Sequence, residues 1–281
     1  MTTVAYLGPE GTNTHVAAQA RFGRRSTYVH APTVDDVFEL VEREQADCGV
    51  VPIENSLEGA VTHTLDRFID FKQSPVKIHG EIEQLIKHFL IMDAKTPLSH
   101  VKVVYSHPQA LAQCNHWLQE HLPKVRRWET DSTAEAVEYL CDDQRGGRWE
   151  LEERAAIGRR ELANRSQLLR PIPIPNDREN KTRFLILGLG GPRRGRRNKT
   201  SILFSLKDRP GALYDALTPF KRERINLTKI ESRPSKRKAW EYYFFIDVEG
   251  HDTERRVTRA LAMLRRRAEF LTVLGSYPVV R

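Results

Sequence analysis

Asn180-Lys181-Thr182-Arg183-Phe184, running into Leu185-Ile186-Leu187, closes the first of two domains that we expect in this chain. The segment places a hydroxyl, a guanidinium and an aromatic ring at the mouth of an apolar run typical of a β-strand, in which successive side chains point to opposite faces. Glycines at 188, 190 and 191 interrupt that strand, and the basic segment 192–199 is typical of a solvated linker. A second periodic pattern begins at Ser201 and indicates a second domain.

Length and composition favour a soluble two-domain protein. The chain has 281 residues, 40% hydrophobic and 29% charged, which is enough for two domains with a core each. The cysteines at 48, 114 and 141 are odd in number and far apart, which favours reduced thiols over disulfides or a zinc site. No secretory signal pattern and no apolar run of about 18 residues is present, so we expect a cytoplasmic protein without a membrane partner.

The net charge of +8 is unevenly distributed. Residues 1–190 hold 23 Lys+Arg and 27 Asp+Glu, giving −4, whereas residues 191–281 hold 22 and 10, giving +12. Such a basic block is typical of a nucleic-acid surface, but its aromatic residues do not alternate with the basic runs as stacking platforms do. We therefore interpret it as a linker and exposed helix faces, and we predict no nucleic-acid partner.

Polar side chains follow the predicted strands of the first domain. After the strand at 3–7, Thr12 and Thr14 precede a helix-like segment, where they serve either to bind a carboxylate or to cap the helix. Glu54, Asn55 and Ser56 follow the buried strand at 48–51, and the alternative is again a polar turn before a helix. In open α/β sheets the ligand lies beyond the carboxyl ends of the strands, so we expect such side chains to lie near a ligand.

Two further strand ends have the same character. Ser106 and Gln109 follow the strand at 101–105, and Ser132 and Thr133 open a helix behind a capping-box pattern. We expect a last buried strand at 155–158 with a helix reaching about residue 169, and then an extended crossover imposed by the prolines at 171, 173 and 175. The alternation of strand and helix predicts one or two parallel α/β sheets, and the second domain has the order βαββαβ of a ferredoxin-like fold.

Five segments in this order resemble the catalytic signatures of prephenate dehydratase. They are Gly8-Pro9-Glu10-Gly11-Thr12, Pro52-Ile53-Glu54-Asn55-Ser56, Ser106-His107-Pro108-Gln109-Ala110-Leu111, Asp131-Ser132-Thr133-Ala134 and Thr182-Arg183-Phe184. The C-terminal part is similar to an ACT domain, a regulatory module that binds amino acids, through Gly211-Ala212-Leu213-Tyr214 and Glu231-Ser232-Arg233-Pro234. The resemblance covers nearly the whole chain.

This resemblance implies a two-lobed α/β catalytic domain, similar to type II periplasmic binding proteins, with substrate in the cleft between the lobes. We place it at residues 1–190, with lobes at about 1–78 plus 171–190 and at 79–170. A basic linker at 191–199 and a ferredoxin-like ACT domain at 200–281 follow. No chorismate-mutase segment precedes Tyr6-Leu7-Gly8-Pro9, so we expect a monofunctional enzyme.

The implied activity is that of a carbon–oxygen lyase, which removes water and carbon dioxide from prephenate and gives phenylpyruvate for phenylalanine synthesis. No cofactor and no metal is implied. The resemblance makes Thr182 the donor to the leaving hydroxyl, with Glu54 as an alternative acid, and makes Arg183 either a carboxylate ligand or a residue that orients the strand. The remaining substrate-binding residues that it implies are Thr12, Thr14, Asn55, Ser56, Ser106, Gln109, Ser132, Thr133 and Phe184.

The ACT motifs imply an allosteric site for L-phenylalanine. Its residues are Gly211, Ala212, Leu213, Tyr214, Glu231, Ser232, Arg233 and Pro234. Because ferredoxin-like regulatory domains often pair edge to edge, we expect a homodimer or homotetramer in which phenylalanine inhibits by favouring a closed catalytic cleft. Arogenate dehydration and a non-catalytic amino-acid sensor remain the alternative functions.

Overall fold

The computed structural model describes residues 1–70, 74–142, 150–175, 179–192, 194–235 and 241–279. The chain divides into two compact units. The first unit comprises Met1–Leu7, Ala17–Glu83 and Arg183–Arg281, and the second comprises Gly8–Val16 and Gln84–Thr182. Trp240, with which we expected a strand of the second domain to begin, lies outside the described residues.

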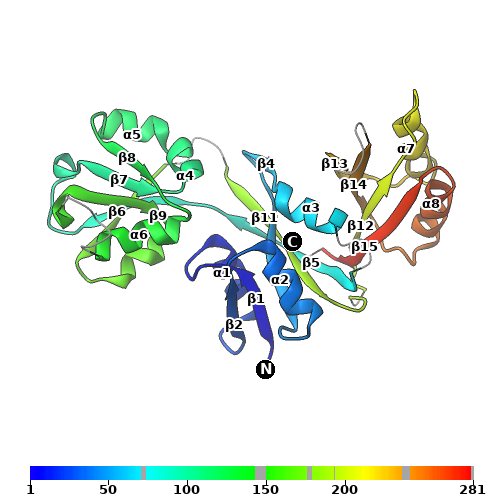
Figure 1. The fold of residues 1–281 in the computed structure, drawn as a ribbon, viewed down its shortest axis with the longest axis horizontal. Helices are drawn as coiled ribbons and strands as arrows, with labels where there is room; N and C mark the ends of the chain where they lie inside the picture. Colours follow the sequence, from blue (N-terminus) through cyan, green and yellow to red (C-terminus); the bar gives the residue numbers. More distant parts are fainter. Residues whose placement is uncertain (71–73, 143–149, 176–178, 193, 236–240, 280–281) are drawn as a thin grey trace. The chain divides into compact units, whose positions relative to one another are not determined.

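The first sheet of the first unit has the strand order β2-β1-β3-β11-β5, with β4 paired to β3 (Figure 1). Its strands are β1 (Thr3–Leu7), β2 (Thr27–Ala31), β3 (Cys48–Asn55), β4 (Gly59–Ala60), β5 (Val76–Leu85) and β11 (Lys181–Leu189). Its helices are α1 (Asn13–Phe22), α2 (Val34–Glu42) and α3 (Thr62–Asp70). Apolar residues of α2 and α3 pack on one side of the sheet, and Ala17 and Ala18 of α1 pack with its other side.

Local sequence explains where α2 begins. Thr33 accepts a hydrogen bond from the Asp36 backbone N–H, and the Asp36 carboxylate accepts one from the Thr33 N–H, which together form a capping box. Val34, Val37, Phe38 and Val41 are all buried on one side of this helix. The capping pattern in the sequence is therefore confirmed.

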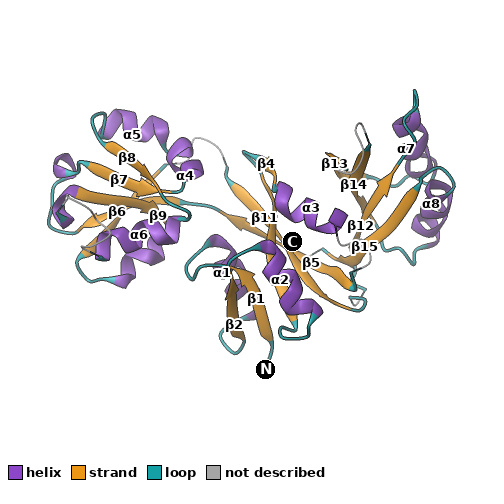
Figure 2. Ribbon diagram, viewed as in Figure 1, coloured by secondary structure: helices purple, strands orange, loops and turns teal. Residues whose placement is uncertain are grey.

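The second unit contains a five-stranded sheet with the order β10-β6-β9-β7-β8. Its strands are β6 (His88–Asp93), β7 (Val103–Ser106), β8 (Arg126–Glu129), β9 (Arg154–Gly158) and β10 (Leu169–Ile174). The helices α4 (Pro108–Gln113) and α5 (Asn115–His121) pack on one face, and α6 (Thr133–Cys141) packs on the other (Figure 2). Short 3₁₀ helices lie at Leu98–His100, Leu151–Glu153 and Arg160–Arg165.

This sheet corrects two expectations. It is mixed rather than parallel, because β6 runs antiparallel to both β9 and β10. The helix expected up to residue 169 is only the 3₁₀ turn Arg160–Arg165, after which the chain forms β10. The prolines at 171 and 173 fit β10 because it is an edge strand, where alternate backbone N–H groups need no partner. The chain returns to the first unit only at Arg183.

The third sheet, also in the first unit, has the order β13-β14-β12-β15. Its elements are β12 (Asn198–Ser205), α7 (Ala212–Arg222), β13 (Leu227–Pro234), β14 (Tyr242–Glu249), α8 (Arg255–Arg265) and β15 (Phe270–Pro278), in the expected order βαββαβ. Phe204, Ile246 and their neighbours pack against α7 and α8 on one face. Asn198 and Lys199, which we expected in the linker, already belong to β12.

The other face of the third sheet shares a core with the first sheet. Leu203, Phe245 and Leu274 belong to the same apolar cluster as Ile53, Phe68 and their neighbours. A β-bulge at Leu274 brings the Gly275 backbone against β5, so closely that a Cβ atom on Gly275 would lie 2.2 Å from the Ile78 carbonyl oxygen. The two sheets therefore form one packed body within the first unit.

We expect Gly275→Ala to destabilise the first unit by about 1–3 kcal/mol, because the added methyl group collides with main-chain atoms that cannot rotate away. Urea unfolding followed by circular dichroism measures the loss. Gly191→Ala is the control, because a Cβ atom there meets nothing within 4 Å. Equal midpoints for the two variants would contradict the close approach.

Candidate active site and effector surface

The strand ends of the second unit bring several predicted hydroxyl groups to one edge of the sheet. Strands β7, β8 and β9 are parallel, so their carboxyl ends share an edge. Ser106 is fully buried there, and its Oγ donates to the Ile157 carbonyl at 2.8 Å. Ser132 caps α6 by accepting from the Glu135 N–H at 3.0 Å, and Thr133 is the first residue of that helix. We call this edge, with Ser106, Ser132 and Thr133, the hydroxyl-rich edge.

The segment Gly8–Val16 packs against the hydroxyl-rich edge. A Cβ atom on Gly11 would lie 2.7 Å from Leu162 and 3.7 Å from Ala134, which follows Thr133. Arg165 ties the two segments together, since Nη2 donates to the Glu10 carbonyl at 3.2 Å and Nη1 donates to the Ala134 carbonyl at 3.3 Å. Thr12 and Thr14 are thus held close to the start of α6.

Thr12 and Thr14 differ in their surroundings. The Thr12 Oγ1 accepts from the His15 N–H at 3.3 Å, so this hydroxyl caps α1 as the capping alternative expected. Thr14 is only 5% exposed. His15 is also buried, and its Nδ1 accepts from the Gly11 N–H at 3.1 Å, which fixes the turn before the helix.

The side-chain amide of Gln113 links the segment that carries Gln109 to the segment that carries Thr182. The Gln113 Oε1 of α4 lies 2.8 Å from its donor Asn180 Nδ2 and 2.7 Å from His88 Nε2. Gln109 stands one helical turn before Gln113, so both amides lie on one side of α4. Thr182, half-buried, follows Asn180 by two residues and is the last residue of the second unit.

Glu54 and Arg183 belong to a six-residue ion-pair network in the first unit. Arg183 contacts Glu81 at 3.3 Å and Asp247 at 3.2 Å through Nη1, and it pairs with Glu54 through Nη2. Lys229 of β13 contacts Glu54 at 3.1 Å, and Lys199 of β12 contacts Glu81 at 2.7 Å. Three cations and three anions therefore join the first sheet to the third.

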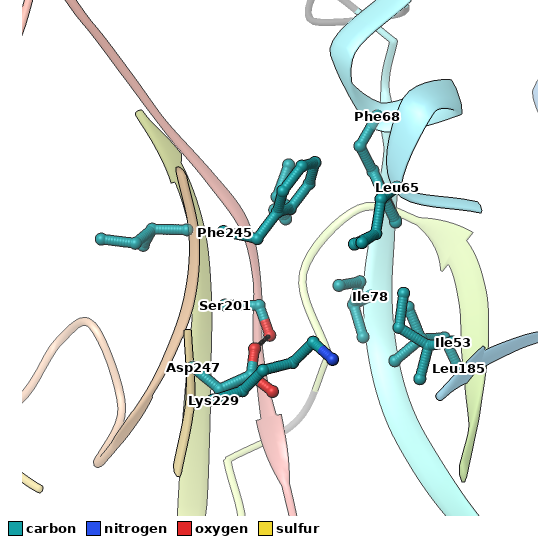
Figure 3. A pocket seen from close by; sticks show the side chains of 11 residues that line it. Ile53, Leu65, Phe68, Ile78, Leu185, Ser201, Lys229, Phe245 and Asp247 are labelled. Carbon is teal, nitrogen blue, oxygen red and sulfur yellow. Dashed lines mark hydrogen bonds between the residues drawn. The ribbon is translucent and has the colours of Figure 1, made fainter. Parts of the chain in front are cut away.

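The seam beside this network is mostly apolar. Figure 3 shows Phe245, Ser201, Lys229 and Asp247 of the third sheet facing residues of the first sheet and α3. The Ser201 Oγ donates to Asp247 Oδ1 at 2.6 Å. The seam encloses about 20 Å³, which is room for a single water molecule, and it is too small for an amino acid.

Electrostatics keep Glu54 ionised. Burial alone raises the pKa of Glu54, but the neighbouring Arg183 and Lys229 outweigh burial, and the net result is a lowered pKa. For Arg183 burial has the opposite sign and lowers the pKa. The carboxylates of Asp247, Glu81 and Glu54 outweigh burial, and the pKa of Arg183 is strongly raised overall. A carboxyl group whose pKa is lowered is a poor proton donor at neutral pH.

The other predicted residues of the first unit have separate roles in the structure. The Asn55 Oδ1 accepts from the Leu57 and Glu58 N–H groups at 2.9 and 3.3 Å, which orders the turn between β3 and β4. Ser56 is exposed on that turn. Phe184 is 1% exposed and packs in the core beside Tyr6, so its ring supports the sheet.

The predicted effector residues lie on α7 and β13. Gly211 has φ +77° and caps α7 with the left-handed conformation that glycine favours, and it is followed by Ala212, Leu213 and the 73% exposed Tyr214. On β13 the exposed residues Ser232 and Pro234 alternate with Glu231 and Arg233. Arg233 makes two hydrogen bonds, of 3.0 and 3.1 Å, to the Asp66 carboxylate of α3.

Sequence reasoning missed several residues of these sites. Glu81, Asp247, Lys199 and Lys229 are single charged residues in separate strands, and only the fold brings them to Glu54 and Arg183. Arg159 is the other omission, and it follows β9 at the hydroxyl-rich edge. The only sequence signal for Arg159 as a site residue was its position as a charged residue directly after a buried strand.

These arrangements define an α/β enzyme of the open-sheet class with an attached ferredoxin-like regulatory domain. The family model of prephenate dehydratase matches residues 4–191, and that of the ACT domain matches residues 200–265. The chain belongs to the prephenate dehydratase family, with a two-lobed periplasmic-binding-protein-like catalytic domain and an ACT domain.

Three similar proteins illustrate the relationship. The bifunctional chorismate mutase/prephenate dehydratase of Aquifex aeolicus is 47% identical over 275 residues, which are 98% of this chain and 73% of that protein. The prephenate dehydratase of Methanocaldococcus jannaschii is 40% identical over 88% of this chain and 86% of its own. The crystal structure of the Arthrobacter aurescens prephenate dehydratase in complex with L-Phe matches with a TM-score of 0.87 at 34% identity. This match covers 98% of the present chain and 89% of the Arthrobacter aurescens chain.

The described residues form neither a metal-binding cluster nor a membrane-spanning helix. No group of three His, Cys, Asp or Glu side chains within the described ranges is placed to hold a metal ion. In the same part of the chain, no helix is long and apolar enough to cross a membrane.

We expect Lys229→Met to lower stability by about 1–3 kcal/mol at pH 7, because Glu54 and Arg183 lose a buried partner. The pKa of Glu54 is lowered from 4.5 in the folded state, so its ion pairs stabilise the protein above pH 4.5. This stabilisation is lost as the pH falls through the folded-state pKa. The difference from wild type should therefore shrink below about pH 4.5. Urea unfolding between pH 7 and pH 3 measures the difference.

Lys221→Met is the matched control, because Lys221 is exposed on α7. It should leave stability nearly unchanged at every pH. A Lys229→Met effect that stayed constant between pH 7 and pH 3 would show that packing, not charge, holds Lys229.

Proposed function

We propose that this protein catalyses the decarboxylative dehydration of prephenate to phenylpyruvate, under control by L-phenylalanine. The observation that carries the proposal is a family match over residues 4–191 in a chain whose signature residues stand at strand ends and helix starts. We further propose that the protein is cytoplasmic. Arogenate, the amino-acid analogue of prephenate, remains the alternative substrate, and the same assay separates the two.

The reaction breaks the bond between the ring and its carboxylate, and that electron pair forms a ring double bond and expels the hydroxyl group. The departing oxygen takes up a proton and leaves as water, and the carboxylate leaves as carbon dioxide. Formation of the aromatic ring drives the reaction, so the enzyme mainly orients the carboxylate and assists the leaving oxygen. Thr182 is the proposed donor to that oxygen within a hydrogen-bonded set, since an isolated hydroxyl is a weak acid.

We assign Glu54 and Arg183 supporting roles. The lowered pKa of Glu54 and its contacts with Arg183 and Lys229 disfavour Glu54 as the acid. Three carboxylates of the protein itself surround Arg183, which supports the strand-orienting alternative over direct binding of substrate. Arg183 then fixes β11 directly after Thr182 and thereby orients the hydroxyl.

The hydroxyl-rich edge is the proposed binding surface for the substrate carboxylates and ring. Its hydroxyl groups stand where α1 and α6 begin, and unpaired backbone N–H groups at helix starts favour anions. Thr12, Thr14, Ser106, Gln109, Ser132 and Thr133 form this proposed set. In the first unit, Asn55 and Ser56 on the turn after β3 are the proposed substrate-binding residues.

We expect Thr182→Ala to reduce kcat by about 100- to 10,000-fold, the usual contribution of a proton donor. Thr182→Ser keeps the hydroxyl and should retain most activity. Phenylpyruvate formation from prephenate, with arogenate assayed in parallel, measures the effect, and circular dichroism verifies folding. A folded Thr182→Ala protein with wild-type turnover would remove Thr182 from the mechanism. Wild-type protein inactive on both substrates would favour the amino-acid sensor.

The proposed phenylalanine site has a physical connection to the catalytic lobe. The Arthrobacter aurescens relative was crystallised with L-Phe, which supports the same effector here. Strand β13 carries Ser232 and Pro234 of the proposed site, and its Arg233 and Lys229 contact Asp66 and Glu54. Phenylalanine would act by binding one of two states more tightly, and pairing of two ACT domains in a homodimer or homotetramer would complete its site.

We expect Asp66→Asn to weaken the coupling between phenylalanine and catalysis by about 5- to 150-fold, because it releases Arg233 from α3. Calorimetry should still detect phenylalanine binding, while the inhibition of prephenate turnover falls. Asp70→Asn, on the exposed side of the same helix, is the control. Unchanged inhibition in the folded Asp66→Asn variant would rule out this route.

A further inference from the structure

Arg159 stands at the hydroxyl-rich edge, although no signature segment contains it. It follows Gly158, the last residue of β9, and a Cβ atom on Gly158 would lie 3.2 Å from the Thr133 carbonyl oxygen. The neighbouring strand β7 ends at Ser106, whose hydroxyl donates a hydrogen bond to the Ile157 carbonyl. Arg159 therefore leaves the sheet beside two of the proposed substrate-binding residues.

The Arg159 side chain is mostly buried, and its guanidinium is only partly paired. Its side chain is 14% exposed. Nη2 donates to the Glu161 carboxylate at 3.1 Å, but Glu161 is 65% exposed, and an ion pair with so exposed a group is weak. Nη1 is inaccessible to solvent and has no acceptor among the described residues. A buried N–H of a charged group without an acceptor is costly, so this position is suited to an anionic acceptor.

Arg159 differs from the other basic groups at this edge because its positive charge is only partly neutralised by a partner. Burial lowers the pKa of His15, Glu10 opposes that effect, and Arg159 lowers the pKa further, so His15 is held neutral. Arg165 is committed to the carbonyls of Glu10 and Ala134 and to Glu138. The predicted hydroxyl groups supply hydrogen bonds but no charge, whereas Arg159 supplies both.

We infer that Arg159 binds one carboxylate of the substrate through its guanidinium group. The inference rests on the proposed function, because it takes the substrate to be a cyclic dicarboxylate. A guanidinium matches a carboxylate in charge and in the planar arrangement of its donors, and it does so better than a hydroxyl or an ammonium group. Arg159 thereby holds the substrate at the hydroxyl-rich edge, while Thr182 acts on the leaving oxygen.

The test compares Arg159→Gln with Arg160→Gln, the exposed neighbouring residue that serves as control. We expect Arg159→Gln to raise the KM for prephenate by about 10- to 100-fold with a much smaller change in kcat, since a charged hydrogen bond to the substrate is lost. Added guanidinium ion should partly restore the Arg159→Gln variant at low substrate. Thermal unfolding should show that its own stability is not reduced, because the buried donor without an acceptor is gone.

Arg159→Lys covers the case in which the glutamine variant does not fold, and its KM should lie between those of wild type and Arg159→Gln. Calorimetric titration with prephenate separates this inference from the proposed function. Wild-type binding that Arg159→Gln weakens supports the inference even without turnover. Wild-type turnover with the same KM in Arg159→Gln or Arg159→Lys overturns the inference and leaves the proposed function standing. A wild-type protein that neither binds nor converts prephenate overturns both.

Discussion

The contact of one guanidinium, that of Arg183, with three carboxylates is the interaction on which the first unit depends. Glu54 comes from β3, Glu81 from β5 and Asp247 from β14, so a single side chain joins three strands of two sheets. Without a central cation, these carboxylates would repel one another at low exposure. Lys199 and Lys229 complete the neutralisation, and the network holds equal numbers of positive and negative groups.

The apolar seam and the ion pairs strengthen each other. The shared core places Phe245 and Leu274 beside residues of the first sheet, which keeps water from the neighbouring charges and increases their attraction. The charges in turn fix the register of the seam, because an ion pair requires a specific geometry that apolar contacts alone do not impose. The close approach of Gly275 to Ile78 is possible because glycine has no side chain.

Local patterns were predictable from the sequence, and long-range contacts were not. The capping box at Thr33, the glycine turn at Gly211 and the order of the ACT elements all follow from periodicity and cap residues within short windows. Phe184 shows the limit, since its burial depends on α1 packing with the other side of the sheet. The helix predicted after Gly158 was wrong because its helix-forming residues were considered by themselves. The sequence did not reveal that the following residues pair as β10 with the edge of β6. The ion-pair partners of Arg183 carry no signal in any short window.

The two sides of β13 give the proposed regulation a physical path. Lys229, Glu231 and Arg233 stand opposite Asp247, Phe245 and Tyr243 in register, on the face toward the first sheet. Ile230 and Ser232 stand opposite Ile246 and Phe244, on the face toward the helices. Because β13 is the edge strand, an effector on the helix side can displace it without breaking the centre of the sheet. Any such displacement moves Lys229 and Arg233, and with them the charges that hold Glu54 and α3.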